Sequence, residues 1–322
     1  MMNLIQRRKF GSTALIIAVF LILIITVFSG VISPVSRNVF KSPESAKFIR
    51  DQYIEILNRW PVPSRKHTIS TSQGETFVIE SGSEGKPKLI LLHGSMSNSL
   101  MWMKEVLLWE QQFHIYTVDI IGEPGLSAPS RPALNTSSYA QWLDEIREQL
   151  GIQSASFIGT SLGGWFALDY TIRRPEAVDN LVLVSPGGVG RQRNILWWVI
   201  PLALLGDWGK NKTRQLMVGE QSTEVSELGA MLTNFLSVVP QHFNPRLNKL
   251  PIFTDEELGN IKIPVMAVVG GKDLMLDAEQ IRERLNKNIK NLKLEYLPEA
   301  RHYPGDRSRQ ILSFLEQNTD AH

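Results

Sequence analysis

Short apolar runs alternate with amphipathic segments along most of the chain, and this alternation constrains the fold more than any other feature. Residues 88–93, 114–120 and 263–271 are mainly apolar runs that end in turn residues, as expected of parallel strands buried on both faces. Between such runs lie segments with helical spacing, for example residues 139–150, which Gly151 ends. The alternation predicts an α/β fold with a mostly parallel central sheet and helices on both faces.

The same patterns predict the other elements of the sheet and its helices. Residues 67–72 and 76–81 are short β-type runs around a turn at Gly74 and indicate a hairpin. Further strands are expected at residues 154–160, 180–186 and 292–298, and further helices at residues 161–174, 278–288 and 306–317.

Residues 1–36 differ in character from the rest of the chain. Residues 14–32 are an apolar run without a charged member, and at about 1.5 Å per residue such a run covers roughly 29 Å, close to the hydrocarbon thickness of a bilayer. We therefore expect a short tail and a transmembrane helix in residues 1–36. The alternative is a signal peptide cleaved after Ser29, which would release a secreted protein. Basic residues before the run favour a cytoplasmic tail with the body on the extracytoplasmic side of the cell membrane (Arg7, Arg8 and Lys9).

Two segments without strand character lie outside the expected α/β core. Residues 37–65 form a connector with several prolines, in which residues 47–60 have the spacing of an amphipathic helix. We expect this helix to pack on the domain, and the alternative is that it lies on the membrane surface. Residues 190–250 divide the core into residues 66–189 and 251–322. We expect this insertion to be a helical lid over the active edge of the sheet.

The segment from Gly159 to Gly163 matches the pattern G-x-S-x-G, with Ser161 at its centre. An expected strand precedes it and an expected helix follows, which is the setting of a nucleophile elbow. The alternative is a serine that only caps the helix. In an elbow, the backbone N–H of Leu162 faces a developing oxyanion, and the loop after residues 88–93 supplies a second N–H, for which Ser95 is the best candidate.

A serine nucleophile needs a base and an acid. In the α/β folds that carry the serine on such an elbow, these residues follow it in the order Asp or Glu, then His. His302 lies between the last expected strand and the last helix, where the base belongs, whereas His242 lies in the lid. Asp273 follows the strand at 263–271 and is the favoured acid. Asp277 competes with it, but Asp277 stands three residues before Gln280, as expected of a helix N-cap with a capping-box partner.

Other residue patterns argue against further chemistry. His93 and the loop at residues 119–127 are expected to be structural. The chain has no cysteine, and it contains no HExxH, EF-hand or P-loop motif, so no metal or cofactor is expected. Its net charge of +2, from 34 basic and 32 acidic residues, gives no indication of a nucleic-acid partner.

With these motifs the chain resembles the α/β-hydrolase superfamily, and more closely the bacterial carboxylesterases of the naproxen-esterase (carboxylesterase NP) type. Residues 59–82, 114–129 and 251–277 carry the closer resemblance. The resemblance implies hydrolysis of carboxylic esters without a cofactor, with Ser161 as nucleophile, Asp273 as acid and His302 as base. The chain departs from the family pattern in its N-terminal apolar run, in Arg301, where a glycine usually precedes the histidine, and in residues 304–310.

The sequence therefore predicts a membrane-anchored serine hydrolase that cleaves small, hydrophobic carboxylic esters. Trp197 and Trp198 of the lid are candidates for an acyl pocket, and the alternative is that they pack the lid on the core. Other reactions of the same triad remain open: thioester hydrolysis, acyl transfer, C–C hydrolysis or aminopeptidase action. A catalytically silent, membrane-tethered binding module is a further alternative.

Overall fold

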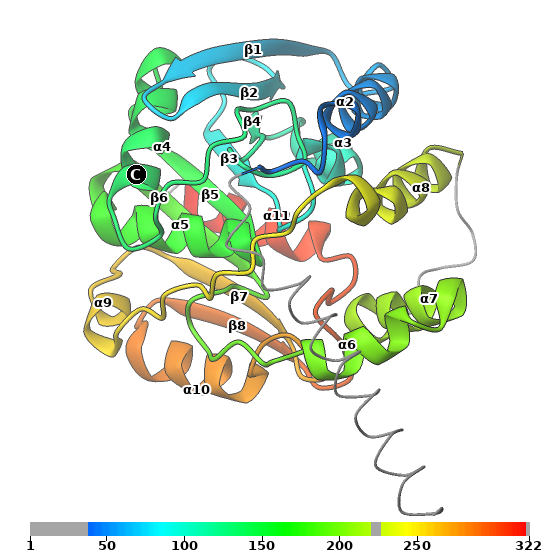
Figure 1. The fold of residues 1–322 in the computed structure, drawn as a ribbon. Coiled ribbons are helices and arrows are strands. Elements are labelled where there is room, and N and C mark those ends of the chain that lie inside the picture. Colours follow the sequence, from blue (N-terminus) through cyan, green and yellow to red (C-terminus); the bar gives the residue numbers. More distant parts are fainter. Residues whose placement is uncertain (1–37, 220–226, 320–322) are drawn as a thin grey trace, which may run out of the picture. The chain divides into compact units, whose positions relative to one another are not determined.

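The computed structural model describes residues 38–219 and 227–319, and its centre is an eight-stranded sheet in the order β1-β2-β4-β3-β5-β6-β7-β8 (Figure 1). The strands are β1 (Ser64–Thr71), β2 (Gly74–Ser81), β3 (Lys88–Leu92), β4 (His114–Val118), β5 (Ala155–Thr160), β6 (Val178–Val184), β7 (Val265–Gly270) and β8 (Leu292–Leu297). β1 and β2 form an antiparallel hairpin, β2 pairs antiparallel with β4, and all pairs from β4 to β8 are parallel. The predicted mostly parallel sheet is confirmed.

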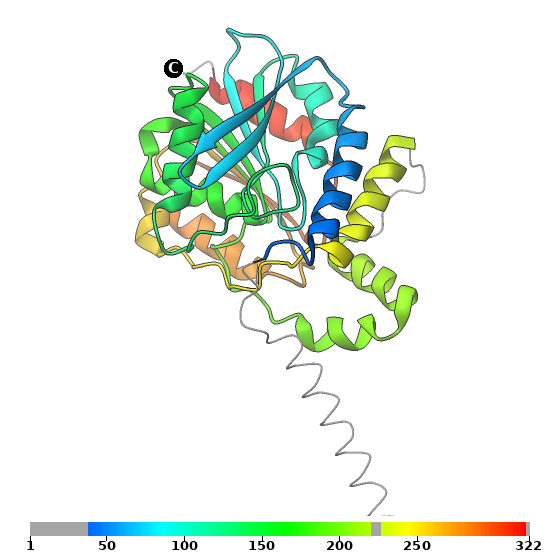
Figure 2. The same cartoon turned by 45° about the horizontal axis from the view of Figure 1, so that its top comes forward.

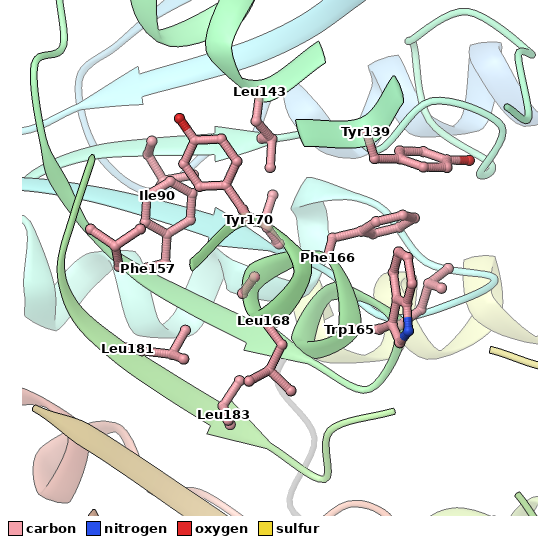
Figure 3. Close-up of a cluster of buried hydrophobic side chains, with 14 of the residues drawn as sticks. Ile90, Tyr139, Leu143, Phe157, Trp165, Phe166, Leu168, Tyr170, Leu181 and Leu183 are labelled. Atoms are coloured by element: carbon pink, nitrogen blue, oxygen red, sulfur yellow. The ribbon is translucent and has the colours of Figure 1, made fainter. Parts of the chain in front are cut away.

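Helices cover both faces of the sheet, as the continuous apolar strands require. On β5, Phe157 points into one hydrophobic cluster and Ile158 into the other, because successive side chains of a strand face opposite sides. Figure 3 shows the first cluster, where the ring of Phe157 lies beside that of Tyr170 at 5.2 Å between centroids. This face carries α4 (Ser138–Gln149), α5 (Leu162–Arg173) and α10 (Ala278–Asn288), and the other face carries α3 (Met103–Trp109) and α11 (Ser308–Thr319).

The helix α3 and the 3-10 turn before it, η1 (Ser99–Trp102), were not among the elements predicted from the sequence. The turn begins at Asn98, whose side chain accepts a hydrogen bond from the N–H of Leu100. Apolar residues occupy most positions from 100 to 109, so the sequence shows no clear polar face there. Two further short elements are η2 (Pro175–Ala177) and α9 (Asp255–Gly259).

The connector contains α2 (Pro43–Leu57), and the side chain of Ser42 caps its first turn. Ile49, Tyr53 and Ile56 of α2 are buried in a cluster that also holds residues of β2 and α8 (Glu227–His242). The helix therefore packs on the domain, as expected from its amphipathic spacing.

In the described part of the chain, four helices lie between β6 and β7: α6 (Leu196–Ala203), α7 (Gly206–Val218), α8 and the short α9. The first three fall within residues 190–250, where the lid is predicted. Within residues 38–219 and 227–319, no helix is both long enough and apolar enough to span a bilayer. The transmembrane helix predicted at residues 14–32 lies outside the described residues, so its prediction stays a prediction.

Candidate active site

Ser161 occupies the sharp turn between β5 and α5. Its backbone has φ 54° and ψ −109°, a conformation that costs energy in a non-glycine residue and is characteristic of functional sites. Gly163 allows this turn to lie against β3, because a Cβ atom on Gly163 would overlap the carbonyl oxygen of Leu92. The side chain of Ser161 makes no capping hydrogen bond to α5, which argues against the helix-cap interpretation.

The side chains of Ser161, His302 and Asp273 form one hydrogen-bonded chain. His302 Nε2 lies 2.9 Å from Ser161 Oγ, and His302 Nδ1 lies 2.7 Å from Asp273 Oδ2. An ionised carboxylate only accepts hydrogen bonds, so Nδ1 carries the proton and Nε2 is left to accept from the serine hydroxyl. The three residues come from the ends of β5, β8 and β7 and meet at the carboxyl edge of the sheet.

The backbone around the triad holds these side chains in place. Asp273 is 2% exposed, and its Oδ1 accepts hydrogen bonds from the N–H groups of Met275 (2.7 Å) and Leu276 (3.1 Å). Ser185, which follows β6 with φ 45°, donates its hydroxyl to the carbonyl oxygen of His302 at 2.7 Å. Ser185 was not predicted to contribute to the site. The only signal for it in the sequence is a serine at the end of an expected strand.

The competing acid and the lid histidine lie elsewhere. Asp277 is the N-cap of α10 and accepts a hydrogen bond from the N–H of Gln280. The expected capping box is wrong, because the N–H of Asp277 donates to the carbonyl of Arg191 and the side chain of Gln280 accepts from the N–H of Arg191. His242 stacks on Phe48 of α2, with a ring-to-ring distance of 4.4 Å.

The two N–H groups predicted for the oxyanion hole belong to the start of α5 and to the loop after β3. Leu162 is the first residue of α5, where N–H groups have no carbonyl one turn back to which they can donate. Ser95 lies in the loop after β3, and this loop approaches Ser161 so closely that a Cβ atom on Gly94 would lie 3.6 Å from Ser161 Cβ.

A buried carboxylate supports the loop that carries Ser95. Glu123 Oε2 accepts a hydrogen bond of 2.8 Å from the N–H of Met96, whose own φ is 58°. Burial raises the pKa of Glu123, and Arg246 opposes this shift, with its Nε 3.9 Å from Glu123 Oε1. The sequence predicted a structural loop at residues 119–127, but it did not predict that Glu123 would contact the loop after β3 that carries Ser95 (the oxyanion loop).

His93 and Asp119 also have structural contacts near the site. His93 Nε2 accepts from the N–H of Ile120 at 2.9 Å, and burial lowers the pKa of this imidazole. Asp119 Oδ1 accepts from the hydroxyl of Tyr53 on α2 and from the N–H and hydroxyl of Ser99. Both residues therefore hold loops at the carboxyl edge.

The lid meets the site through Arg301. Its guanidinium donates a hydrogen bond of 2.7 Å to the carbonyl of Leu216, which connects the loop that carries His302 to α7 in the predicted lid. Trp197 is 75% exposed and Trp198 is half-buried, and their role as an acyl pocket stays a prediction. In the described part of the chain, no three His, Asp or Glu side chains gather where they could hold a metal ion.

Comparisons with known proteins identify the family to which the chain belongs. Residues 87–216 match the alpha/beta hydrolase fold family. The chain is 30% identical to the uncharacterized carboxylesterase nap of Bacillus subtilis, over 78% of this chain and 84% of that protein, and 29% identical to carboxylesterase YbfK of the same organism, over 86% and 96%. The crystal structure of naproxen esterase (carboxylesterase NP) from Bacillus subtilis superposes with a TM-score of 0.73 at 26% identity and covers 86% of this chain and 99% of that one. The chain is a carboxylesterase-like hydrolase and belongs to the α/β-hydrolase family that includes these Bacillus carboxylesterases.

Proposed function

We propose that this protein hydrolyses carboxylic esters through an acyl-enzyme on Ser161, with His302 as general base and acid and Asp273 as the residue that orients it. The observation that carries the proposal is the hydrogen-bonded chain from Ser161 through His302 to Asp273. Relatives named as carboxylesterases support esters as the substrate class.

The geometry supports a two-step reaction. Ser161 Oγ attacks the ester carbonyl while His302 Nε2 takes its proton, and the negative charge that develops on the carbonyl oxygen faces the N–H groups of Leu162 and Ser95. His302 then gives the proton to the leaving alkoxide, and the ester C–O bond breaks. A water molecule, deprotonated by His302, then attacks the acyl carbon of the acyl-enzyme. The bond from that carbon to Ser161 Oγ breaks, His302 returns the proton to Oγ, and the carboxylic acid is released.

A series of p-nitrophenyl esters with increasing acyl length tests this proposal. The expected result is hydrolysis of short and medium acyl chains that disappears in the Ser161→Ala variant. The same comparison with thioesters and amino-acid anilides separates an esterase from the other reactions of a serine triad. Turnover of one of those substrates with no turnover of any ester would overturn the proposal.

We also propose that the chain is anchored by a single membrane span at residues 14–32, with the catalytic body on the extracytoplasmic side. The length of the apolar run and the basic residues Arg7, Arg8 and Lys9 before it support this topology. A substrate that partitions into membranes, such as a hydrophobic ester, would be concentrated near such an enzyme.

Membrane fractionation tests the topology. The full-length chain should remain in the membrane after a carbonate wash, and protease added to intact spheroplasts should digest the body. Protection from the protease would reverse the orientation. A soluble chain that begins near Gly30 would identify the run as a cleaved signal peptide.

A further inference from the structure

The α6–α7 hairpin presents an apolar surface that the body does not cover. Every residue of α6 is apolar, and none of its side chains from Trp197 to Ala203 is buried. At the tip, Leu204 is 72% and Leu205 57% exposed, and Trp208 on α7 is 64% exposed. A helix that is apolar all round normally lies in a protein core or in a membrane, so this surface calls for a partner.

The two helices of the hairpin pack closely on each other, and hydrogen bonds at both ends join the hairpin to loops at the carboxyl edge of the sheet. Gly209 brings α7 against the end of α6, because a Cβ atom there would overlap the carbonyl oxygen of Leu202. At one end of the hairpin, the N–H of Arg193 donates to the carbonyl of Met275 in the Asp273 loop at 2.8 Å. At the other end, Arg301 holds the carbonyl of Leu216. The apolar surface therefore has a defined orientation next to the triad.

In the sequence, the apolar run proposed as a membrane span lies close to the start of the catalytic body. Only residues 33–37 separate the apolar run from Asn38, and an extended link of this length reaches about 20 Å at most. The body begins with Phe40 in a β-bridge to Phe243, directly after α8. Figure 2 shows the first turn of α2 and the last turn of α8 on the side of the body that carries α6 and α7.

The charge of the hairpin distinguishes a bilayer from a second copy of the chain. Residues 196–218, which form the hairpin, contain three basic residues and one acidic residue (Lys210, Lys212 and Arg214 against Asp207). Two such hairpins would repel each other, whereas anionic lipid headgroups attract basic residues next to an apolar face. Tryptophan and leucine are also the side chains typical of the interfacial layer.

We propose that the α6–α7 hairpin docks on the surface of a lipid bilayer that contains anionic headgroups. Leu204, Leu205 and Trp208 lie in the interfacial layer, and the basic residues contact the headgroups. The lid then serves as a second membrane contact beside the N-terminal span, and it holds the catalytic edge next to the lipid.

A fluorescent label on the tip tests this docking, and the absence of cysteine from the chain makes a single label straightforward. The full chain is prepared as Leu204→Cys and, as matched control, as Ser72→Cys in the exposed turn between β1 and β2. Each variant is labelled with a nitrobenzoxadiazole dye and reconstituted in vesicles of phosphatidylcholine and phosphatidylglycerol. The label at position 204 should shift to the blue and lose at least half of its emission to nitroxide-bearing lipids, whereas the label at position 72 should do neither.

Two results would overturn the proposal. A label at position 204 that behaves as in water, on a chain that floats with the vesicles, would exclude docking while leaving the N-terminal anchor intact. A blue shift without quenching by the nitroxide lipids would mean that protein covers the hairpin, either by closure onto the body or by a second copy. A parallel series in pure phosphatidylcholine should show weaker quenching, and equal quenching in both lipids would remove the role assigned to the basic residues.

Discussion

The carboxyl edge of the sheet and the α6–α7 hairpin are joined by the contact of Arg301 with Leu216, yet their residues are used in opposite ways. At the edge, polar side chains are fixed by hydrogen bonds to neighbouring groups. Asp273, for example, accepts hydrogen bonds from the N–H groups of Met275 and Leu276. On the hairpin, large apolar side chains such as Trp208 are exposed. The difference indicates that the edge is built for a fixed geometry, whereas the hairpin is built for contact with something outside the body.

The largest effect should follow from a change of the nucleophile at the edge. Ser161→Ala removes the only hydroxyl that His302 Nε2 contacts in the triad, and kcat for a soluble ester should fall on the order of 10⁶-fold, as in triad knockouts elsewhere. Steady-state kinetics with p-nitrophenyl acetate measures this loss, and circular dichroism serves as the control for folding. A variant with near-normal kcat would remove Ser161 from the mechanism.

The acid of the triad should show the next largest effect. Asp273→Asn keeps the shape of the side chain but favours the wrong tautomer of His302, so kcat should fall on the order of 10⁴-fold with the fold intact. The matched control is Asp277→Ala, which should leave kcat near the wild-type value and lower the free energy of unfolding by about 1 kcal/mol through loss of the cap on α10. The reverse pattern would identify Asp277 as the acid.

Helix α8 and the α6–α7 hairpin can be compared by their contributions to the free energy of unfolding. Phe235 on α8 is 2% exposed and packs with Tyr53 of α2, so Phe235→Ala should lower the free energy of unfolding by about 3–5 kcal/mol. Trp208→Ala on α7 should change it by about 0.5 kcal/mol or less, because that side chain is largely exposed. Urea denaturation followed by circular dichroism measures both. Equal losses would show that the hairpin is part of the packed core.

Glu105 on α3 is expected to make the stability of the fold depend on pH. Burial raises the pKa of Glu105 on α3 to about 7, with Asp306 adding to the shift and Lys104 opposing it. Between the unfolded pKa of 4.5 and the folded pKa of about 7, the unfolded chain loses the Glu105 proton more readily than the folded chain. The free energy of unfolding therefore falls as the pH rises from 4.5 to about 7. Glu105→Gln should therefore match the wild type near pH 4 and exceed its free energy of unfolding by up to about 3 kcal/mol above pH 7. Melting curves across this range measure the difference, and a difference that does not depend on pH would contradict the assignment.

The smallest effect on the rate is expected at Glu123, which acts on the site only through the loop that carries Ser95. Glu123→Gln weakens the acceptor that holds the N–H of Met96, so the oxyanion loop should be less well placed and kcat should fall about tenfold, with KM nearly unchanged. Kinetics on the p-nitrophenyl series separates kcat from KM. A rise in KM alone would assign Glu123 to substrate binding instead.

The features that could be predicted from the sequence are those encoded in local patterns. The alternation of apolar runs predicted the parallel sheet, and the setting of Ser161 between a strand and a helix predicted the elbow. The rule of chain order then indicated His302 and Asp273, which the structure brings together with Ser161. A parallel sheet places the ends of distant strands at one edge, so residues far apart in the chain could be grouped without any contact being known.

The features that could not be predicted depend on contacts between distant segments. Ser185 and His302 are 117 positions apart, and nothing in either local sequence indicates that a hydroxyl there meets a backbone carbonyl. The partner of Gln280 was predicted incorrectly because capping patterns are local, whereas its side chain contacts the lid segment at Arg191. The exposure of α6 was also hidden, because an apolar run looks the same in a sequence whether the body covers it or not.

The most direct test of the central claim is the covalent labelling of the full-length protein with a fluorophosphonate, followed by peptide mass spectrometry. An activated serine should give one adduct per chain, on the peptide that contains Ser161, and the Ser161→Ala variant should give none. An unlabelled wild type, or an adduct on another residue that persists in Ser161→Ala, would contradict the assignment of Ser161 as the nucleophile.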